Sequence, residues 1–510
     1  MQTQPSLGCL CLVLCPGVRM ASPEDAISTE DMRAFEINAE NLGVSIELLM
    51  ENAGNAVAGV LECLLGGLQG AKVAVLAGKG GNGGDGIAAA RRLAARGARV
   101  EIHLTHPRGE VKHPAARTML KGVEASRVEV LEPGAPGWLD LGGVDAVVDA
   151  LLGIGVKGGL RGSVKAAAEA YNKAGGLKIS VDVPTGVDPD TGDAVEGAVR
   201  SDYTVSMHKP KKGLFKGAAP LYAGEVLTAE IGVPWAAEYY AGPGDVAARI
   251  PRRPRDAHKG VGGRVLVVGG SSEYVGAPIL AALAAYAAGV DLVYLASPFS
   301  REAALARPEI VPRRMEEASR VVERVHAVVA GPGMGGEGED LLWEVLDAAR
   351  KRGVPAVVDA DGLKALARRG DRLWGGAVLT PHRGEAKLLL GGEDLPPLRA
   401  AREIAARYGA TTIVKAPVDA VCSPEGRCRE SPWGAPEMSV GGTGDVLAGV
   451  LAGFLARRRA LGLDPDPLNT AAAALYTVGK AGEDLATEEG LVSPLRLVEA
   501  VKRVVAGSRT

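Results

Sequence analysis

Short apolar runs alternate with helix-periodic stretches along most of this chain. The runs are rich in Val, Ile, Leu and Ala, and most are followed by Gly or Asp. Continuous apolar runs separated by helices are typical of strands that are buried on both faces, so we predict an α/β fold with parallel, doubly wound sheets. Ligand sites in such sheets lie at the carboxyl ends of the strands. The expected strands are residues 72–77, 99–104, 146–149, 178–182, 264–268, 327–330, 356–359, 377–379 and 412–414, and the clearest expected helices are 32–65, 87–96 and 278–288.

The 510 residues exceed what one hydrophobic core usually organises, so we predict two domains. The pattern is interrupted between Pro234 and Pro254, where Ala-Gly-Pro-Gly and Pro-Arg-Arg-Pro-Arg predict a linker. We assign residues 20–240 and 241–510 to two α/β domains and treat residues 1–19 as an extension outside the fold.

Composition favours small-molecule chemistry. Charged residues make up 23% of the chain, the net charge is −3 and aromatic residues make up 4%, so we expect no nucleic acid partner. The N-terminus has neither a secretory signal nor a spanning segment, so we expect no membrane association and a cytoplasmic location. We also expect a homo-oligomer. Cys422 and Cys428 flank a turn. We favour two reduced thiols, because disulfides are rare in reducing compartments, and a bridge across a hairpin is the alternative.

The sequence Gly441-Gly442-Thr443-Gly444-Asp445 precedes an apolar run with helical continuation, so it caps a helix. Glycines let backbone N–H groups approach an anion, and the helix N-terminus carries partial positive charge; a phosphate therefore fits here. Asp445 then stands as a base for an attacking hydroxyl. The alternative is a capped helix whose Asp stabilises the dipole.

Three further loops follow strands directly and are expected to line the same crevice. They are 331–335 (GPGMG), 359–362 (DADG) and 380–385 (TPHRGE). His382 is as often structural as functional in such a position, beside Glu385.

In the first half, Gly78 to Gly86 lies between a strand and a helix and contains the spacing G-x-G-x-x-G, which alone is weak evidence. The next strand does not end in the acidic residue of a dehydrogenase. Asn82 and Asp85 add polar groups that a tight turn does not need. Asp149 and Asp182 end two strands, which suggests a cation site or an acid/base pair, although each also fits a helix cap.

From about residue 245 the chain resembles the ribokinase-like ADP- or ATP-dependent NAD(P)H-hydrate dehydratases. The motifs are HKGVGGRVLVVGGSSEYVGAP (258–278), GPGMG, VDADGL, LTPHRGE and GGTGD. The resemblance implies that the hydrated dinucleotide contacts Ala277, Gly333, His382 and Asp445, and that ADP or ATP, with Mg²⁺, contacts Lys415, Ala416, Pro417, Val418, Asp419 and Gly444. Lys415-Ala416-Pro417 departs from the family's Lys-Gly.

Residues from about 25 to 240 resemble the NAD(P)H-hydrate epimerases, which have a Rossmann-like three-layer sheet. The motifs are LLMENAG (48–54), the glycine-rich loop, VVDALLGIGVKGGLRG, SVDVPTGVDPDTG and MHKPKKGLF (207–215). By this resemblance, Asp182 is the acid/base, and K⁺ is held by Asn82, Asp149 and Thr185, where Thr replaces the family's Ser. The implied substrate contacts are Gly81, Asn82, Gly83, Gly84, Asp85, Gly153, Ile154, Gly155, Val156, Lys157, Gly158 and Gly159, with the latter loop extending to Arg161.

The sequence therefore predicts a bifunctional repair enzyme: the first domain interconverts R and S hydrates, and the second dehydrates the S form. Two alternatives stay open. A sugar or vitamin kinase uses the same glycine-rich turn and Asp base, and the first domain is then a non-catalytic nucleotide-binding module. A kinase releases a stable phosphorylated substrate, whereas a dehydratase releases inorganic phosphate and restores the reduced nicotinamide.

Overall fold

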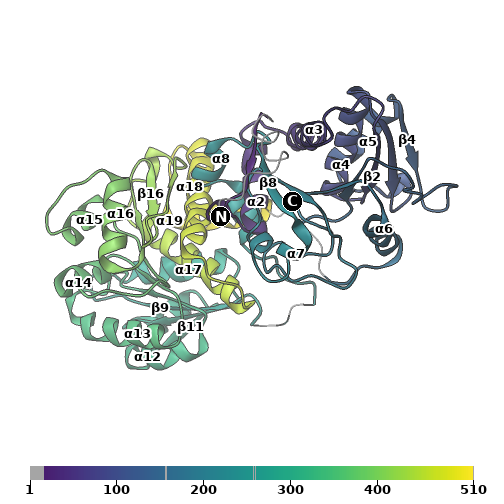
Figure 1. Cartoon of the computed structure of the whole chain (residues 1–510). Coiled ribbons are helices and arrows are strands. Elements are labelled where there is room, and N and C mark those ends of the chain that lie inside the picture. The colour runs from purple at the N-terminus through teal and green to yellow at the C-terminus, as the bar shows by residue number, and fades with distance from the viewer. Residues whose placement is uncertain (1–15, 155–157, 257, 259, 509–510) are drawn as a thin grey trace. The chain divides into compact units, whose positions relative to one another are not determined.

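A computed structural model describes residues 16–154, 158–256, 258 and 260–508 (Figure 1). The chain divides into two compact units, Met1–Pro234 and Trp235–Thr510. Each unit contains one large sheet with helices on both faces. The predicted α/β fold with two three-layer domains is therefore confirmed.

The described part of the N-terminal unit forms an eight-stranded sheet in the order β1-β8-β7-β6-β5-β2-β3-β4. All neighbouring strands run parallel except β1 and β8. The order reverses direction between β2 and β5, so the switch point, where ligands bind in such sheets, lies there. The strands are β1 (Val18–Met20), β2 (Lys72–Ala77), β3 (Arg99–Leu104), β4 (Val128–Leu131), β5 (Ala146–Ala150), β6 (Leu177–Val181), β7 (Tyr203–Met207) and β8 (Glu225–Ala229).

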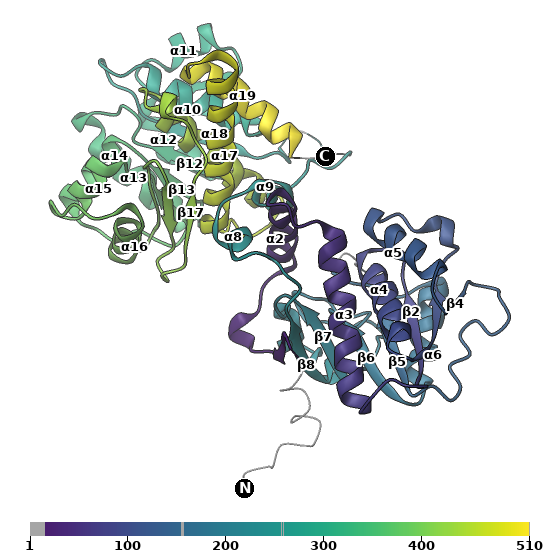
Figure 2. The same ribbon diagram turned by 90° about the horizontal axis from the view of Figure 1, so that it is seen from above.

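Helices α3 (Ile46–Leu65), α4 (Gly81–Ala95) and α5 (Pro114–Glu124) cover one face of this sheet, and α6 (Gly162–Lys173) covers the other (Figure 2). Two predictions are corrected. The expected helix 32–65 is two helices, because α2 (Thr29–Asn41) ends before Gly43, whose φ of +91° does not fit a helix.

The second correction concerns the start of the chain. Residues 1–15 lie outside the described residues, but β1 begins at Val18, inside the predicted extension, and Val18 pairs with Ala229 of β8. The fold therefore begins before Met20.

Glycines explain why α4 starts six residues earlier than the apolar pattern predicts. A Cβ atom on Gly84 would lie 2.5 Å from the Met50 sulfur, and one on Gly86 would lie 2.3 Å from the Ala150 Cβ. The glycine-rich segment is thus the first turn of the helix, packed closely against α3 and the sheet, and only Gly78–Gly80 form the loop before it.

Among the described helices, only α3 is long and apolar enough to cross a membrane by length and composition. Its buried side chains pack against α4 and α5. Packing within the unit therefore accounts for its apolar face.

The C-terminal unit contains, over its described residues, a nine-stranded sheet in the order β11-β10-β9-β12-β13-β14-β15-β16-β17. Only the pairs β15–β16 and β16–β17 are antiparallel. The switch point lies between β9 and β12. The strands are β9 (Arg264–Val268), β10 (Leu292–Ala296), β11 (Ile310–Arg313), β12 (Ala327–Ala330), β13 (Ala356–Val358), β14 (Ala377–Leu379), β15 (Thr411–Val414), β16 (Asp419–Cys422) and β17 (Cys428–Ser431).

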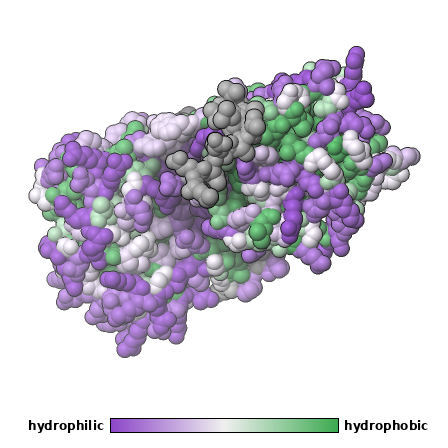
Figure 3. Space-filling view, viewed as in Figure 1, coloured by the Kyte–Doolittle hydropathy of each residue, from purple (hydrophilic) through white to green (hydrophobic). Residues whose placement is uncertain are grey.

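Alternate residues of these strands enter two separate cores, as a sheet covered on both faces requires. Val265 and Val267 pack with one helical layer, and Leu266 and Val268 pack with the other. Hydrophilic residues dominate the visible face of this unit (Figure 3). The first layer contains α10 (Gly276–Ala287), α17 (Thr443–Ala460), α18 (Pro467–Glu489) and α19 (Pro494–Gly507), and the second contains α13 (Glu339–Lys351), α14 (Asp361–Arg369), α15 (Arg383–Leu389) and α16 (Pro397–Tyr408).

The predicted linker is wrong, because this segment folds as part of the C-terminal unit. It contains α8 (Trp235–Tyr239) and α9 (Pro243–Arg249). Asp245 of α9 is completely buried, and its carboxylate accepts two hydrogen bonds from Arg429 of β17, at 2.6 and 2.9 Å, and one from Arg249 at 3.1 Å. A buried ion cluster of this kind fixes the segment in place, which local Gly and Pro content does not reveal.

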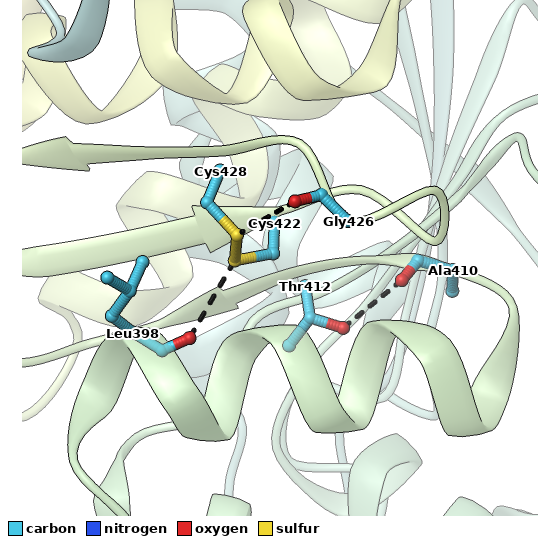
Figure 4. The surroundings of a disulfide bond; sticks show 6 residues. All are labelled: Leu398, Ala410, Thr412, Cys422, Gly426 and Cys428. Carbon is cyan, nitrogen blue, oxygen red and sulfur yellow. Dashed lines mark hydrogen bonds between the residues drawn. A yellow bond between two sulfur atoms is a disulfide. The ribbon is translucent and has the colours of Figure 1, made fainter.

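Cys422 and Cys428 form a disulfide, so the favoured interpretation as two free thiols is corrected (Figure 4). The two residues are direct partners across the β16–β17 hairpin, with Cα atoms 4.1 Å apart. The antiparallel pairing brings their side chains to the same point of the sheet.

Candidate active sites

The N-terminal unit has a cavity of about 520 Å³ at the carboxyl ends of β2, β5 and β6. It lies at the switch point of the sheet, where the sequence pattern places the ligand. Of the predicted site residues, Gly81, Asn82, Asp85, Gly153, Ile154 and Asp182 line it.

The other predicted contacts of this unit are placed differently. Gly83 and Gly84 are buried beneath the cavity, where a Cβ atom on Gly83 would lie 1.8 Å from the Gly78 carbonyl oxygen; they serve the packing of α4. Gly158 and Gly159 do not line the cavity. Gly155, Val156 and Lys157 lie outside the described residues.

Asp182 is held rigidly at the mouth of β6. Its φ of +66° is unusual for a residue with a side chain, and such strain is concentrated at functional sites. The completely buried Lys211 donates to Oδ1 of Asp182, as does the Met207 N–H at 3.0 Å. Both of these groups donate to Oδ1, so within the described structure Oδ2 is available to another partner.

Two more carboxyl groups of this cavity have strongly shifted pKa values. Burial raises the pKa of Glu36, Lys211 opposes the shift and Asp182 adds to it, with a net pKa of about 7. Burial, Asp182 and Glu36 together raise the pKa of Asp85 well above its usual range. A group with a pKa near 7 exchanges protons readily at neutral pH.

Glu36 and Lys211 are candidate functional residues that were not predicted from the sequence. Glu36 interrupts the buried stripe of α2 formed by Met32, Phe35 and Ala39, and an acidic residue in an apolar stripe is a usable signal. Lys211 sits in a run of lysines that has the composition of a solvated surface, and nothing in the run distinguishes the buried one.

Of the three predicted K⁺ ligands, Asn82 lines the cavity, and Asp149 and Thr185 are hydrogen-bonded to each other beside it. Asp149 is completely buried; Thr185 donates to it through both its hydroxyl and its N–H, at 2.7 and 2.8 Å, and Ser180 donates at 2.8 Å. Burial raises the pKa of Asp149, and these hydrogen bonds oppose the shift. Asn82 donates to the Leu152 carbonyl at 3.1 Å, while its buried Oδ1 has no hydrogen-bond partner within the described structure.

The C-terminal unit has a larger cavity of about 880 Å³. Of the predicted residues, His382, Lys415, Ala416, Pro417, Asp419 and Gly444 line it, whereas Val418, Asp445, Ala277 and Gly333 do not. Apolar side chains such as Trp433, Leu447 and Leu475 form much of the remaining wall, which suits the flat ring of a nucleotide base.

The ammonium group of Lys415 is the main positive charge described at this site. Its ammonium lies 3.1 Å from Oδ1 of Asp359, and a Cβ atom on Gly444 would lie 3.1 Å from the same ammonium. Burial disfavours the charged lysine, but Asp359 and Glu385 raise its pKa above the usual value. Lys415 therefore stays protonated beside the start of α17.

Asp445 occupies the first turn of α17, as the sequence predicts. Burial and then Asp359 raise the pKa of Asp445 and Lys415 opposes the shift, with a net pKa of about 7. Gly442 ends the preceding loop with a φ of +103°, which favours glycine, and a Cβ atom there would lie 2.8 Å from Leu280. The loop glycines thus set the position of the Asp445 carboxyl group.

His382 has the structural role that the sequence left open, and its functional role stays a prediction. Its Nδ1 accepts from the N–H groups of Gly384 and Glu385, at 3.0 and 3.3 Å, and so caps α15. The ring is exposed and lines the cavity. The cap fixes the ring orientation and places Nε2 3.6 Å from Oε2 of Glu385.

The loops after β9 and β12 meet at the switch point. The Gly270 N–H donates to the Pro332 carbonyl at 2.9 Å, and a Cβ atom on Gly333 would lie 3.4 Å from the Ala277 Cβ. The structure thus brings Ala277 and Gly333 together. Asp361 accepts from the Gly335 N–H at 2.9 Å, which ties this loop to the one that carries Asp359.

Two family models match the chain. One is described as NAD(P)H-hydrate dehydratase and matches residues 265–503, and the other is described as YjeF-related protein N-terminus and matches residues 46–213. The matched segments lie in the two units that carry the two cavities.

Curated relatives cover almost the whole chain. The bifunctional NAD(P)H-hydrate repair enzyme of Hyperthermus butylicus is 41% identical over 482 residues, which are 90% of this chain and 88% of the relative. The enzyme of the same description from Pyrobaculum aerophilum is 41% identical over 509 residues, which are 94% and 98% of the two chains. A solved structure of the ADP/ATP-dependent NAD(P)H-hydrate dehydratase of Bacillus subtilis, co-crystallised with ATP and Mg²⁺, is 26% identical and covers 53% of this chain and 98% of its own, with a TM-score of 0.47. By its identity to the curated relatives and the coverage of both chains, this protein belongs to the family of bifunctional NAD(P)H-hydrate repair enzymes.

Proposed function

We propose that the N-terminal unit interconverts the R and S forms of NAD(P)H hydrates and that the C-terminal unit dehydrates the S form at the expense of ADP or ATP. Family membership supports both activities. The observation that carries the second is the position of Asp445, a carboxyl group with a pKa of about 7 in the first turn of α17, beside Lys415.

In the C-terminal unit, the N-terminus of α17 and Lys415 attract the phosphates of the nucleotide. Asp445 removes the proton from the hydroxyl of the hydrate as that oxygen attacks the terminal phosphorus, and the bond from this phosphorus to the rest of the nucleotide breaks, which releases AMP from ADP or ADP from ATP. The phosphate ester that forms is a better leaving group than hydroxide. Its departure, with loss of a proton from the neighbouring ring carbon, restores the double bond of the dihydronicotinamide.

Mg²⁺ would be held mainly by the phosphates. The described residues contain no group of three or more His, Cys, Asp or Glu side chains arranged to hold a metal ion. Mg²⁺ commonly binds through one or two carboxylates together with substrate phosphates, and it neutralises the charge of the transferred phosphoryl group. Asp359, Glu385 and Asp445 would be the carboxylates available for this purpose, since all three act on Lys415.

In the N-terminal unit, Asp182 is proposed as an acid/base at the epimerised carbon. That carbon bears both a hydroxyl group and the ring nitrogen, so loss and re-addition of water inverts it. Oδ1 of Asp182 is occupied by Lys211 and Met207, which aims Oδ2 at the substrate.

The residues around Asp149 fit a K⁺ ion. A completely buried carboxylate is costly without an opposite charge, and the buried Oδ1 of Asn82 is an oxygen without a partner in the described structure. A bound cation would satisfy both and order the loop that carries Asn82. We expect Asn82→Ala to abolish the K⁺ dependence of epimerisation and of the melting temperature; a variant that still responds to K⁺ as the wild type does would remove Asn82 from the site.

The direct test uses the whole chain with a mixture of both hydrate epimers and either ADP or ATP, and follows recovery of reduced nicotinamide absorbance. Complete recovery requires both activities. Recovery that stops at the S fraction would exclude the epimerase, and accumulation of a stable phosphorylated substrate would indicate a kinase. The expected cytoplasmic location and homo-oligomeric state stay predictions.

A further inference from the structure

The N-terminal cavity contains more proton-exchanging groups than one acid/base assignment uses. Glu36, Asp85 and Asp182 all line it, together with the buried Lys211. Glu36 is the only one of the three carboxyl groups that comes from α2; Asp85 lies on α4 and Asp182 follows β6.

The start of α2 is fastened to the segment that carries Lys211. Ile27 and Lys211 form a bridge, in which the Ile27 N–H donates to the Pro210 carbonyl at 2.9 Å and the Lys212 N–H donates to the Ile27 carbonyl at 2.9 Å. Thr29 donates to Asp190 through its N–H at 2.9 Å and through its hydroxyl at 2.6 Å. These bonds hold the helix, and therefore Glu36, against the Asp182–Lys211 pair.

Epimerisation needs two proton transfers, one to the oxygen that leaves the carbon and one from the oxygen that returns to it. When the hydroxyl leaves as water, an acid delivers a proton to its oxygen while the lone pair of the ring nitrogen forms a C=N double bond. When water re-adds on the other face, a base takes its proton and the C=N bond returns to a single bond. One group must be protonated and another unprotonated, and the two exchange roles when the reaction runs in reverse.

We propose that Glu36 is the second proton-transfer residue of the epimerase site and works with Asp182 on the hydroxyl-bearing carbon of the hydrate. This inference rests on the proposed epimerase function of the N-terminal unit. Lys211 pairs with Asp182 rather than with Glu36, so the two carboxyl groups of the cavity are differentiated: Asp182 has a cationic partner at hydrogen-bond distance, and within the described structure Glu36 has none.

The raised pKa of Glu36 supports this division, because a group with a pKa of about 7 supplies the proton that Asp182 then accepts. The charged and titratable groups around Glu36 are Asp182 and Lys211, Asp85 of α4, Arg33 of its own helix, and Lys79 and His113 of the cavity wall. Burial and both other carboxyl groups raise the pKa of Asp85 well above the usual range, and Asp85 lacks the close contact with Lys211 that Asp182 makes.

The test compares Glu36→Gln, Glu36→Asp and the matched control Glu40→Gln in the full chain. Glu40 lies on the same helix, is exposed and does not line the cavity. The rate of R-to-S equilibration is measured by chromatography between pH 5.5 and 8.5, chosen to span roughly the expected inflection. The melting temperature of the N-terminal unit is the control for its folding, and dehydration of the pure S form is the control for the other unit.

We expect Glu36→Gln to slow equilibration by about 100-fold or more and to remove the inflection near pH 7, with dehydration unchanged. Glu36→Asp should recover part of the rate and Glu40→Gln should match the wild type. A Glu36→Gln variant that keeps the wild-type inflection and a rate within a factor of about 3 would overturn the inference. If the wild type itself does not equilibrate the epimers, it is the proposed function of the unit that fails.

Discussion

The ammonium group of Lys415 lies 3.1 Å from Oδ1 of Asp359, and the same carboxylate oxygen accepts a hydrogen bond from the Thr380 hydroxyl at 2.8 Å. Lys415 follows β15, Asp359 follows β13 and Thr380 follows β14. Three neighbouring strand ends thus fix one cation beside the N-terminus of α17. A substitution that displaces the Lys415 ammonium is therefore expected to affect nucleotide binding in particular.

The first prediction concerns Gly444. A Cβ atom at this position would lie 3.1 Å from the Lys415 ammonium, which is tighter than ordinary contact. Gly444→Ala should therefore push Lys415 away from the phosphates and raise the KM for ADP or ATP by about tenfold, equivalent to ~1.4 kcal/mol of binding. Steady-state kinetics of S-hydrate dehydration measures the change.

Gly375→Ala is the matched control, because nothing lies within 4 Å of a Cβ atom there. It should leave the KM unchanged. An unaltered KM in Gly444→Ala as well would show that the nucleotide does not approach this glycine.

The second prediction concerns Asp445 as a base. A base acts in its unprotonated form, so dehydration should rise with pH through about 7, where the pKa of Asp445 lies. Asp445→Asn should lower kcat by about 10² to 10⁴ and leave epimerisation intact. The pH profile of kcat and a separate epimerisation assay test both statements, and Asp347→Asn on the exposed face of α13 serves as the control.

Equal loss of dehydration and epimerisation in Asp445→Asn would point to misfolding. A profile that falls with rising pH in this range would assign Asp445 a role as an acid instead.

The third prediction concerns the stability cost of the same carboxyl group. The folded-state pKa of Asp445 is about 7 and the unfolded value is 3.8, so the folded state binds the additional proton between these values. The free energy of unfolding therefore decreases as pH rises from about 4 to 7 and changes no further above that range. Asp445→Asn removes this cost.

We expect Asp445→Asn to raise the stability of the C-terminal unit at pH 8 by an amount on the order of 2–4 kcal/mol. The gain should shrink towards pH 4, which melting curves at several pH values can measure. A variant that is less stable than the wild type at pH 8 would mean that the Asp445 carboxylate is satisfied in the folded protein.

The fourth prediction concerns the buried ion cluster of α9. Burial alone would raise the pKa of Asp245, but Arg429 and Arg249 hold it below its usual value. Asp245→Ala leaves the largely buried Arg429 and Arg249 without this carboxylate and should cost about 3–5 kcal/mol. Thermal unfolding of the C-terminal unit measures the loss.

Glu317→Ala, which removes an exposed partner of Arg314, is the comparison. Surface pairs contribute little, so its melting temperature should stay close to that of the wild type. A similarly small effect of Asp245→Ala would mean that the segment after Pro234 is only loosely attached to its unit.

The sequence by itself determined the layers of the fold and the edge where the sites lie. Runs such as Lys72–Ala77 and Arg264–Val268 match strands residue for residue, because strands buried on both faces must be continuously apolar. The glycines and Asp445 before an apolar helix predict the start of α17, since helix caps depend on a few adjacent residues. Each of these signals is local.

Only the tertiary structure decided which of the many charged residues share a site. The buried ammonium group of Lys211 donates a hydrogen bond to Asp182, which is distant in the chain. Glu36 has a pKa of about 7 mainly because the folded structure buries it, while Lys211 opposes the shift. The glycines of α4 form the first turn of a helix, and they lack side chains where Met50 and Ala150 pack closely against that turn. Burial and the distances between charges are set by contacts between segments far apart in sequence, and periodicity within one segment contains no record of them.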